Sequence, residues 1–369
     1  MLDLDQLLRL AVERGASDVH IKVGSPPFIR VDGRLEKTTN DVVTPAETER
    51  IAFAVMPKLR AEEFLATNEA DFAYSVRDLG RFRTNVFRQR GSVGLVMRRV
   101  QGNVPTFEQL GLPPVVRRLA EYPRGLVLVT GPTGSGKTTT LGTMIDHINE
   151  SMQRHIVTIE DPIEILHADK NCIVNQREVG TDTLGFHEAL KRVLRQDPDV
   201  ILVGEMRDVE TVRTALAAAE TGHLVFSTLH TISATETINR VIDFFPPYEQ
   251  RQVRMSLAGS LRGIVSQRLV ERRDGGGRVP AVEILVATGR VFDKVANAEE
   301  THEIEEIIAE GEYYGMQTFD QSLLSLYKRG AIDLREALAA STKPHDLRLM
   351  IEQFTLSQAG ADTETAGAA

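Results

Sequence analysis

The second half of the chain alternates between short apolar runs and longer stretches with the periodicity of amphipathic helices. The runs are rich in β-branched residues and apolar on both faces, which is typical of buried strands in a parallel sheet. They comprise residues 125–130, 155–160, 199–204 and 223–228, and the helical stretches comprise 138–149, 186–195 and 208–221. This alternation predicts a three-layer α/β domain. A helix-rich region follows, in which one apolar stripe contains Val253, Leu257, Leu261, Ile264 and Val265.

The first hundred residues contain shorter, mixed elements. Apolar residues between Leu4 and Val12 recur at helical spacing, and Gly15 follows as a stop signal. Strand-like runs and turn signals then alternate. The sequence VDGR at 31–34 and the stretch 81–99, with Gly91 near its middle, predict two hairpins. Together these features predict a small α+β domain over residues 1–100.

Changes in composition mark the remaining boundaries. Residues 101–124 contain four prolines and predict a linker that carries one short helix, Val115–Glu121. We expect the α/β domain and its helical C-terminal part to occupy residues 125–352. Residues 353–369 are mostly small or polar, which predicts a disordered tail.

Composition narrows the class of protein. The 369 residues suffice for two domains, and 42% apolar with 26% charged residues is ordinary for a soluble protein. No stretch approaches the ~20 apolar residues that span a bilayer, and Asp3 and Asp5 stand where a signal peptide would be basic. The lone Cys172 cannot form an internal disulfide or a zinc cluster. A net charge of −9 gives no reason to expect nucleic-acid binding. We therefore expect a cytoplasmic protein with no direct membrane insertion.

The clearest chemical signal is a phosphate-binding loop, or P-loop, between the run 125–130 and the helix that follows it. GPTGSGKTT at 131–139 matches G-x-x-x-x-G-K-[ST], with a strand before and a helix after. Backbone N–H groups of such a loop surround the phosphates of a nucleotide, the lysine pairs with the β- and γ-phosphates, and the first threonine ligates Mg²⁺. The predicted nucleotide-binding residues are Gly131, Thr133, Gly134, Ser135, Gly136, Lys137, Thr138 and Thr139. We expect ATP and Mg²⁺ as cofactors.

Polar residues follow three more of the apolar runs. Glu205 comes directly after the run 199–204, where a carboxylate would hold Mg²⁺ through water. The segment IEDPIE (159–164) ends in Glu164, which could take a proton from an attacking water. His223 and His230 lie at opposite ends of one run, and a lone histidine near a strand end is often only structural.

The order of these motifs resembles that of the secretion ATPases. GPTGSGKTT, TIEDPIE, ILVGEMRD and TGHLVFSTLHT are similar to the Walker A, Asp-box, Walker B and His-box motifs of that superfamily. Within it, the chain resembles the type IV pilus retraction (twitching motility) ATPases of the PilT type, over about residues 1–352. Supporting segments include GASDVHI, PPFIRVDGR, GRFRTNVF and GMQTFDQSL.

The resemblance implies a PAS-like N-terminal domain, a RecA-like ATPase domain and a homohexameric ring. It implies that Glu164 is the general base, Glu205 the Walker B acid, and His230 a γ-phosphate or conformational sensor. Arg81 and Arg83, with Arg98 as a further candidate, would reach the nucleotide from the N-terminal domain. The implied partner is an inner-membrane platform protein of the pilus machine, which would hold the motor at the inner face of the membrane, beside a paralogous ATPase in some systems.

The C-terminal part departs from the family pattern. Where retraction ATPases often carry an AIRNLIRE-like element, this chain has GRVFDKVAN (289–297), and the acidic stretch after it is closer to the PilU-type accessory paralogue. Three alternatives therefore stay open: an accessory paralogue with little turnover, an extension or type II secretion ATPase, and a nucleic-acid translocase. Extension relatives usually carry an extra N-terminal domain and a four-cysteine zinc module, and a translocase needs a basic, aromatic-lined channel. The single cysteine, the absence of Trp and the net charge argue against the last two.

Overall fold

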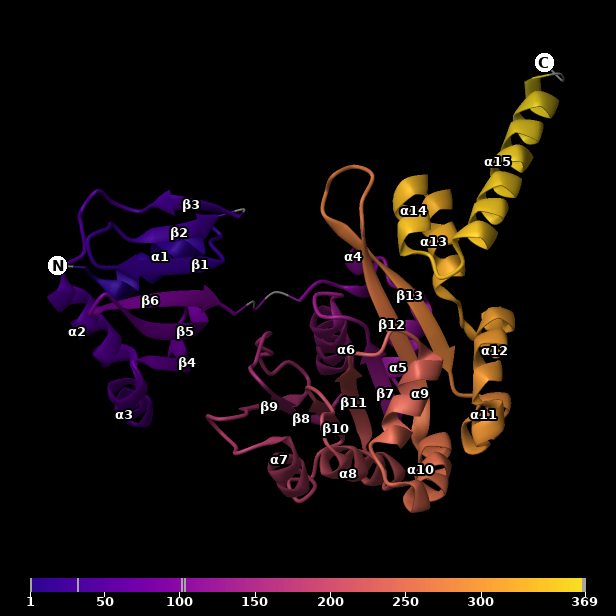
Figure 1. Ribbon diagram of the computed structural model, residues 1–369, viewed down its shortest axis with the longest axis horizontal. Coiled ribbons are helices and arrows are strands. Elements are labelled where there is room, and N and C mark those ends of the chain that lie inside the picture. The colour runs from indigo at the N-terminus through magenta and orange to yellow at the C-terminus, as the bar shows by residue number, and fades with distance from the viewer. Residues whose placement is uncertain (1, 32, 101, 103, 367–369) are drawn as a thin grey trace. The chain divides into compact units, whose positions relative to one another are not determined.

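The computed structural model describes residues 2–31, 33–100, 102 and 104–366, with side chains as far as Thr355 (Figure 1). The chain divides into two units. The first consists of Met1–Asn103 with the segment Ile163–Leu166, and the second of Val104–Pro162 with His167–Ala369. Each unit has its own sheet and its own apolar core.

The first unit is an α+β fold built on a six-stranded sheet of order β3-β2-β1-β6-β5-β4, in which every pair of neighbours is antiparallel. Its core includes Leu8 and Ala11 of the first helix, whose N-terminus is capped by the Asp3 side chain. Both predicted hairpins are present, as β2–β3 and β5–β6. The elements are α1 (Leu4–Glu13), β1 (Asp18–Lys22), β2 (Phe28–Val31), β3 (Arg34–Lys37), α2 (Pro45–Val55), α3 (Lys58–Thr67), β4 (Glu69–Val76), β5 (Gly80–Gln89) and β6 (Ser92–Arg99).

The second unit is an α/β fold around a seven-stranded sheet of order β13-β12-β7-β11-β10-β8-β9. All neighbours are parallel except the β12–β13 pair. The predicted fold class is thereby confirmed. The elements up to the last parallel strand are α4 (Phe107–Leu110), α5 (Pro114–Ala120), β7 (Gly125–Thr130), α6 (Lys137–Ser151), β8 (His155–Glu160), β9 (Ile173–Glu178), α7 (Phe186–Val193), β10 (Val200–Val203), α8 (Val209–Glu220), β11 (Leu224–Leu229), α9 (Ala234–Asp243), α10 (Pro247–Ser260) and β12 (Leu261–Glu271).

The apolar stripe predicted from Val253 to Val265 is a helix only in part. Val253 and Leu257 lie in α10, but the expectation of helix for Leu261, Ile264 and Val265 is wrong, because these residues belong to β12. A strand buried on both faces has no polar side, so its apolar residues can also fall on a helical stripe.

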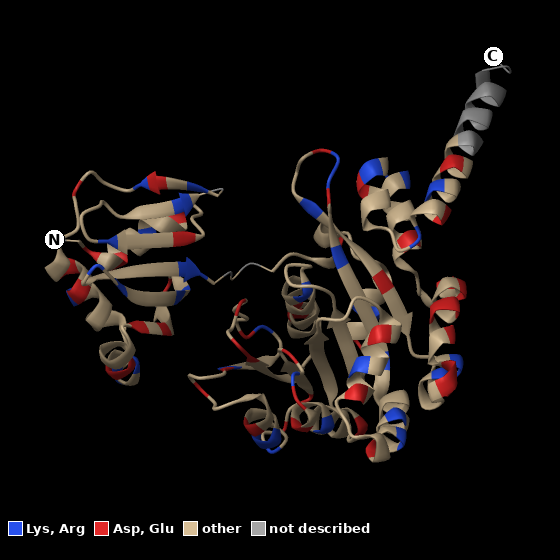
Figure 2. Cartoon of the chain, in the orientation of Figure 1, with Lys and Arg blue, Asp and Glu red and all other residues tan. Residues whose placement is uncertain are grey.

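The C-terminal part is mostly helical and packs on the β12–β13 pair, where α13 contacts β13 and α14 contacts β12. A smaller core includes Val270, Leu323, Leu326 and Leu347. Acidic residues lie along η1 and α12, and arginines lie near the tip of the β12–β13 hairpin (Figure 2). The elements are β13 (Arg278–Val286), α11 (Gly289–Ala296), the 3-10 helices η1 (Ala298–Glu303) and η2 (Gly311–Tyr314), α12 (Ile304–Glu310), α13 (Phe319–Lys328), α14 (Leu334–Ala340) and α15 (Pro344–Ala366).

Two stretches differ from their sequence-based assignment. The residues expected to form a linker, 101–124, include α4 and α5, whose Phe107, Val116 and Leu119 are buried in the core of the second unit. The tail expected to be disordered from residue 353 instead continues α15 to Ala366, while residues 367–369 lie outside the described residues. Leu347 and Ile351 anchor the start of α15, and alanine, frequent beyond them, has the highest helix propensity.

Candidate functional site

The strand order gathers the predicted motifs at one edge of the second sheet. β7, β11, β10 and β8 are consecutive parallel neighbours, so their carboxyl ends lie at the same edge. The P-loop follows β7, His230 follows β11, Glu205 follows β10, and Asp161 follows β8. Ligands of open α/β sheets bind at this carboxyl edge.

The P-loop needs glycine where it passes β12. Gly131 has φ +142°, and a Cβ there would lie 2.3 Å from the Gln267 backbone oxygen. Gly136 has φ +91°, and a Cβ there would lie 2.7 Å from Gln267 Nε2. Gly134, with φ +79°, faces open space. The glycines at the two ends of the loop therefore allow a close approach to β12, while the one at its tip supplies only a left-handed turn.

The loop ends at a helix N-terminus without a side-chain cap. Gly136 is the N-cap residue of α6 and gives no side-chain hydrogen bond, so the first N–H groups of α6 are available to an anion. Lys137 Nζ donates to the backbone oxygens of Gly131 (2.7 Å) and Pro132 (3.0 Å). The lysine ammonium thus contacts carbonyl oxygens of the same loop whose N–H groups would bind the phosphates.

The other predicted loop residues differ in exposure. Thr133 and Thr138 are exposed and Thr139 is half-buried. No described residue hydrogen-bonds to the Thr138 hydroxyl, which is an oxygen of the kind that Mg²⁺ prefers. Ser135 is buried, and its hydroxyl has no hydrogen-bond partner in the described part of the chain.

Glu205 is the centre of an ion-pair cluster at the same edge. Its Oε2 lies 2.8 Å from Arg207 Nη2, and its Oε1 lies 3.2 Å from His230 Nε2. Burial favours a raised pKa for the Glu205 carboxyl, but the hydrogen bonds and charges of Arg207 and His230 together outweigh it, so its pKa is below the usual range. The same pairing raises the pKa of Arg207. Glu205 is therefore a carboxylate at neutral pH.

The hydroxyls of β11 support this cluster. Ser227 Oγ donates to the Val203 backbone oxygen and Thr228 Oγ1 to that of Gly204, each at 2.7 Å. Both bonds hold the end of β10 immediately before Glu205. His223, at the opposite end of β11, has its Nδ1 3.0 Å from the Ala218 backbone oxygen, as expected for a structural histidine.

The acidic segment at the end of β8 has a buried residue and an exposed one. Glu160 is buried, and its Oε1 accepts from Thr158 Oγ1 (2.6 Å) and Gln176 Nε2 (3.1 Å). Glu164 is exposed. Glu164 belongs to the segment Ile163–Leu166, which clusters with the first unit.

The candidate arginines lie on strands of the first unit. Arg81 and Arg83 are in β5, half-buried and exposed respectively. Arg98, in β6, donates from Nε to Asp18 Oδ1 at 2.8 Å. Asp18 is buried, which by itself would raise its pKa, but hydrogen bonds from Arg98 and Ser17 lower the pKa of this carboxyl overall. Arg98 therefore has a structural partner within its own unit.

Two polar residues near the site were not identified from the sequence, Arg207 and Gln267. Arg207 lies within the Walker B-like segment, and its charge is close enough to Asp161 to raise its pKa further. Gln267 is 3% exposed and belongs to β12. The local signal for Gln267 is a polar residue within an apolar run, two positions beyond the predicted helical stripe that ends at Val265.

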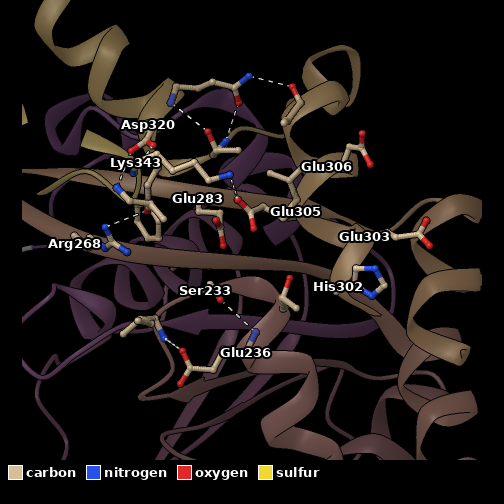
Figure 3. Close-up of a pocket in the computed structure, with 18 of the residues that line it drawn as sticks. Ser233, Glu236, Arg268, Glu283, His302, Glu303, Glu305, Glu306, Asp320 and Lys343 are labelled. Atoms are coloured by element: carbon tan, nitrogen blue, oxygen red, sulfur yellow. Dashed lines mark hydrogen bonds and ion pairs between the residues drawn. The ribbon is translucent and has the colours of Figure 1, made fainter. Parts of the chain in front are cut away.

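A cavity of about 1170 Å³ lies away from the motifs, bounded by α9, β12, β13, α12 and α13 (Figure 3). None of the predicted site residues lines it. Its charges are largely engaged: Lys343 Nζ pairs with Glu305 at 2.8 Å, and Asp320 accepts from the backbone of Thr342 and Lys343. Burial raises the pKa of Glu283 in this cavity to about 7. The candidate active site is therefore the carboxyl edge of the sheet.

The described residues lack two further features. Among the described helices, none is long and apolar enough to cross a membrane. Within the same residues, no group of three or more His, Cys, Asp or Glu side chains is arranged to hold a metal ion.

Comparisons with known proteins agree with this geometry. The family model of type II/IV secretion system proteins matches residues 2–338. The type IV pilus retraction ATPase PilT of Pseudomonas aeruginosa is 45% identical over 94% of this chain and 100% of its own length. The type IV pilus ATPase PilU of the same organism is 44% identical over 97% of this chain and 94% of its own length.

A solved structure is similar over almost the whole chain. The crystal structure of the pilus retraction motor PilT with bound ADP has a TM-score of 0.86 and 46% identity, and the match covers 94% of this chain and 99% of that one. The similarity includes both units.

Proposed function

Because the chain belongs to the type II/IV secretion system protein family, we propose that it is a hexameric ATPase motor that powers type IV pilus retraction in twitching motility. The observation that carries this proposal is 45% identity to a retraction ATPase over that protein's entire length. The enzyme is a P-loop ATP hydrolase, and the ADP held by the similar PilT structure supports a nucleotide at the corresponding loop.

The chain's own residues provide the binding chemistry. Backbone N–H groups of residues 131–136 and of the start of α6 would bind the phosphates, and Lys137 would leave its loop carbonyls to pair with them. The Thr138 hydroxyl and, through water, Glu205 would hold Mg²⁺. The ion neutralises charge that develops on the phosphates. The pairing of Glu205 with Arg207 and His230 keeps its carboxyl ionised for this role.

Three further roles complete the proposed reaction. Glu164 would accept the proton of the attacking water. His230, hydrogen-bonded to Glu205, would sense the γ-phosphate and transmit its loss to β11 and α9. Arg81 and Arg83 would stabilise charge on the transferred phosphoryl group, an effect that is worth about 10³–10⁵ in rate where an arginine is well placed.

The proposed setting is the cytoplasmic face of the inner membrane. The motor would act as a homohexamer on a platform protein of the pilus machine, with no direct membrane insertion and no nucleic acid. The 44% identity to PilU favours a second candidate function, an accessory motor that works beside a main retraction ATPase. The acidic stretch after Asn297 is the feature of this chain that agrees with that candidate.

Purified protein tests the catalytic assignment. We expect Lys137→Ala to abolish nucleotide binding and hydrolysis, and Glu164→Gln to abolish hydrolysis while ATP still binds. The matched controls are Lys191→Ala and Glu210→Gln, both exposed side chains on helices of the second unit. Full turnover by the Glu164→Gln variant would reject Glu164 as the general base, and full binding by Lys137→Ala would reject the loop assignment.

A further inference from the structure

Gln267 lies directly behind the P-loop. In the parallel pairing of β12 with β7, Ser266 is opposite Thr130, so Gln267, the next residue of β12, lies where Gly131 leaves β7. Gln267 is buried, with 3% of its surface exposed. Because a buried amide must satisfy both its donor and its acceptor, a glutamine at this position needs specific partners.

Both partners of the Gln267 amide belong to the loop and its helix. Nε2 donates to the Ser135 backbone oxygen at 2.7 Å, and Oε1 accepts from Thr140 Oγ1 at 2.8 Å. The backbone oxygen of Gln267 faces Gly131, and its Nε2 faces Gly136, closely enough that a Cβ at either glycine would overlap. One residue of β12 therefore contacts the loop at its start, at its end and on the first turn of α6.

The bond to Ser135 fixes the direction of a peptide group. In a trans peptide, the C=O and the following N–H point in opposite directions. With the Ser135 oxygen held toward Gln267, the Gly136 N–H points away from β12. Gly134 and Gly136 flank this peptide, and glycines would otherwise let it rotate.

We propose that Gln267 is a positioning residue for ATP, which holds the Ser135–Gly136 peptide so that its N–H faces the phosphates. It acts through the loop and does not touch the nucleotide. Thr140 Oγ1 holds the amide in the orientation that presents Nε2, rather than Oε1, to the Ser135 oxygen. The inference rests on the proposed ATPase function, since it concerns how the same loop is prepared to bind.

The test compares variants by the binding of a fluorescent ADP analogue and by steady-state ATP hydrolysis. Gln267→Leu removes donor and acceptor at similar volume, and we expect about tenfold weaker ADP binding and a similar rise in KM, with kcat within about twofold. Thr140→Val removes only the partner of Oε1, so a smaller loss, about threefold, is expected. This second variant keeps the test available if Gln267→Leu does not fold.

Two further variants separate positioning from stability. Gln267→Glu keeps an acceptor for Thr140, but in an assay at a pH well above the usual pKa of a carboxyl it has no donor for the Ser135 oxygen. This variant should bind ADP at least as weakly as Gln267→Leu. Gln317→Leu is the matched control, because Gln317 Nε2 donates to the Val282 backbone oxygen at 2.9 Å in the same unit. It should lower the melting temperature without changing nucleotide affinity.

The outcomes are distinct. Wild-type affinity in Gln267→Leu or Gln267→Glu would overturn the inference, as would an equal loss of affinity in Gln317→Leu. A wild-type protein that neither binds ADP nor hydrolyses ATP would instead overturn the proposed function.

Discussion

Replacing Gly131 by alanine tests whether the P-loop is held against β12. The backbone at this position has φ +142°, and the new Cβ would meet the Gln267 backbone oxygen at 2.3 Å and Ser135 Oγ at 2.6 Å. The Ser135 side chain can rotate, but the Gln267 oxygen cannot move freely, because β12 is paired on both sides, with β7 and β13.

The magnitude follows from two separate costs. A non-glycine residue in a backbone region that L-residues avoid costs about 1–3 kcal/mol. Overpacking against a fixed strand adds about 1–3 kcal/mol. The expected loss of folding free energy is therefore about 2–6 kcal/mol, a substantial part of the roughly 5–15 kcal/mol that is typical of a whole domain. Gly134→Ala, with φ +79° and open space, should lose only the conformational part, about 1–2 kcal/mol.

Urea unfolding of the nucleotide-free protein, followed by circular dichroism, measures these losses. Gly330→Ala is the matched control outside the loop, because Gly330 also has a positive φ, +71°, and nothing within 4 Å of a Cβ. The reasoning requires Gly131→Ala to be the most destabilised of the three. Equal losses in all three variants would show that the contact with β12 does not constrain the loop.

Three other substitutions have defined outcomes. Glu283→Gln should stabilise the protein by ~3 kcal/mol above about pH 7 and much less near pH 4.5. Burial raises the Glu283 pKa from 4.5 to about 7, so ionisation of this carboxyl lowers the stability of the folded state as the pH rises between these values. An equal gain in thermal stability at both pH values would contradict this. The Glu205→Gln variant should bind ATP but not hydrolyse it. It should also be less stable than the wild type at neutral pH but not in acid, because the ion pairs of Glu205 with Arg207 and His230 stabilise the fold only above the lowered pKa of its carboxyl. An equal loss of stability in acid would contradict the pairing. Arg83→Ala should lower kcat with KM within about twofold, whereas Arg34→Ala, on the exposed strand β3, should have wild-type kinetics; unchanged kcat in both would reject Arg83.

The sequence was most informative where local pattern and chemistry coincide. Residues 125–139 join an apolar run to a helix through a loop whose glycines are needed by the backbone, so strand, loop and helix were all predictable. The same holds for the ends of β10 and β11, where one polar residue follows a fully buried run. These segments contain most of the information about their own structure.

Features that depend on pairing between distant segments were not predictable. The stripe through Leu261 and Val265 is apolar on every side because β12 lies inside the sheet, and only its neighbours β7 and β13 show it to be a strand. Gln267 was missed for the same reason: its role needs the register of β12 with β7, which no local pattern contains. Arg207 was part of a recognised motif, but its ion pair with Glu205 depends on the path of the chain after β10.

Deletion of the gene in the organism that encodes this chain, with microscopy of surface pili, tests the central claim most directly. The deleted strain should carry excess pili that do not retract, and the wild-type gene, but not the Lys137→Ala variant, should restore retraction. Retraction that persists, slowed, would favour the accessory motor. Loss of pili from the deleted strain would contradict the account, because it would make the chain a motor of pilus extension.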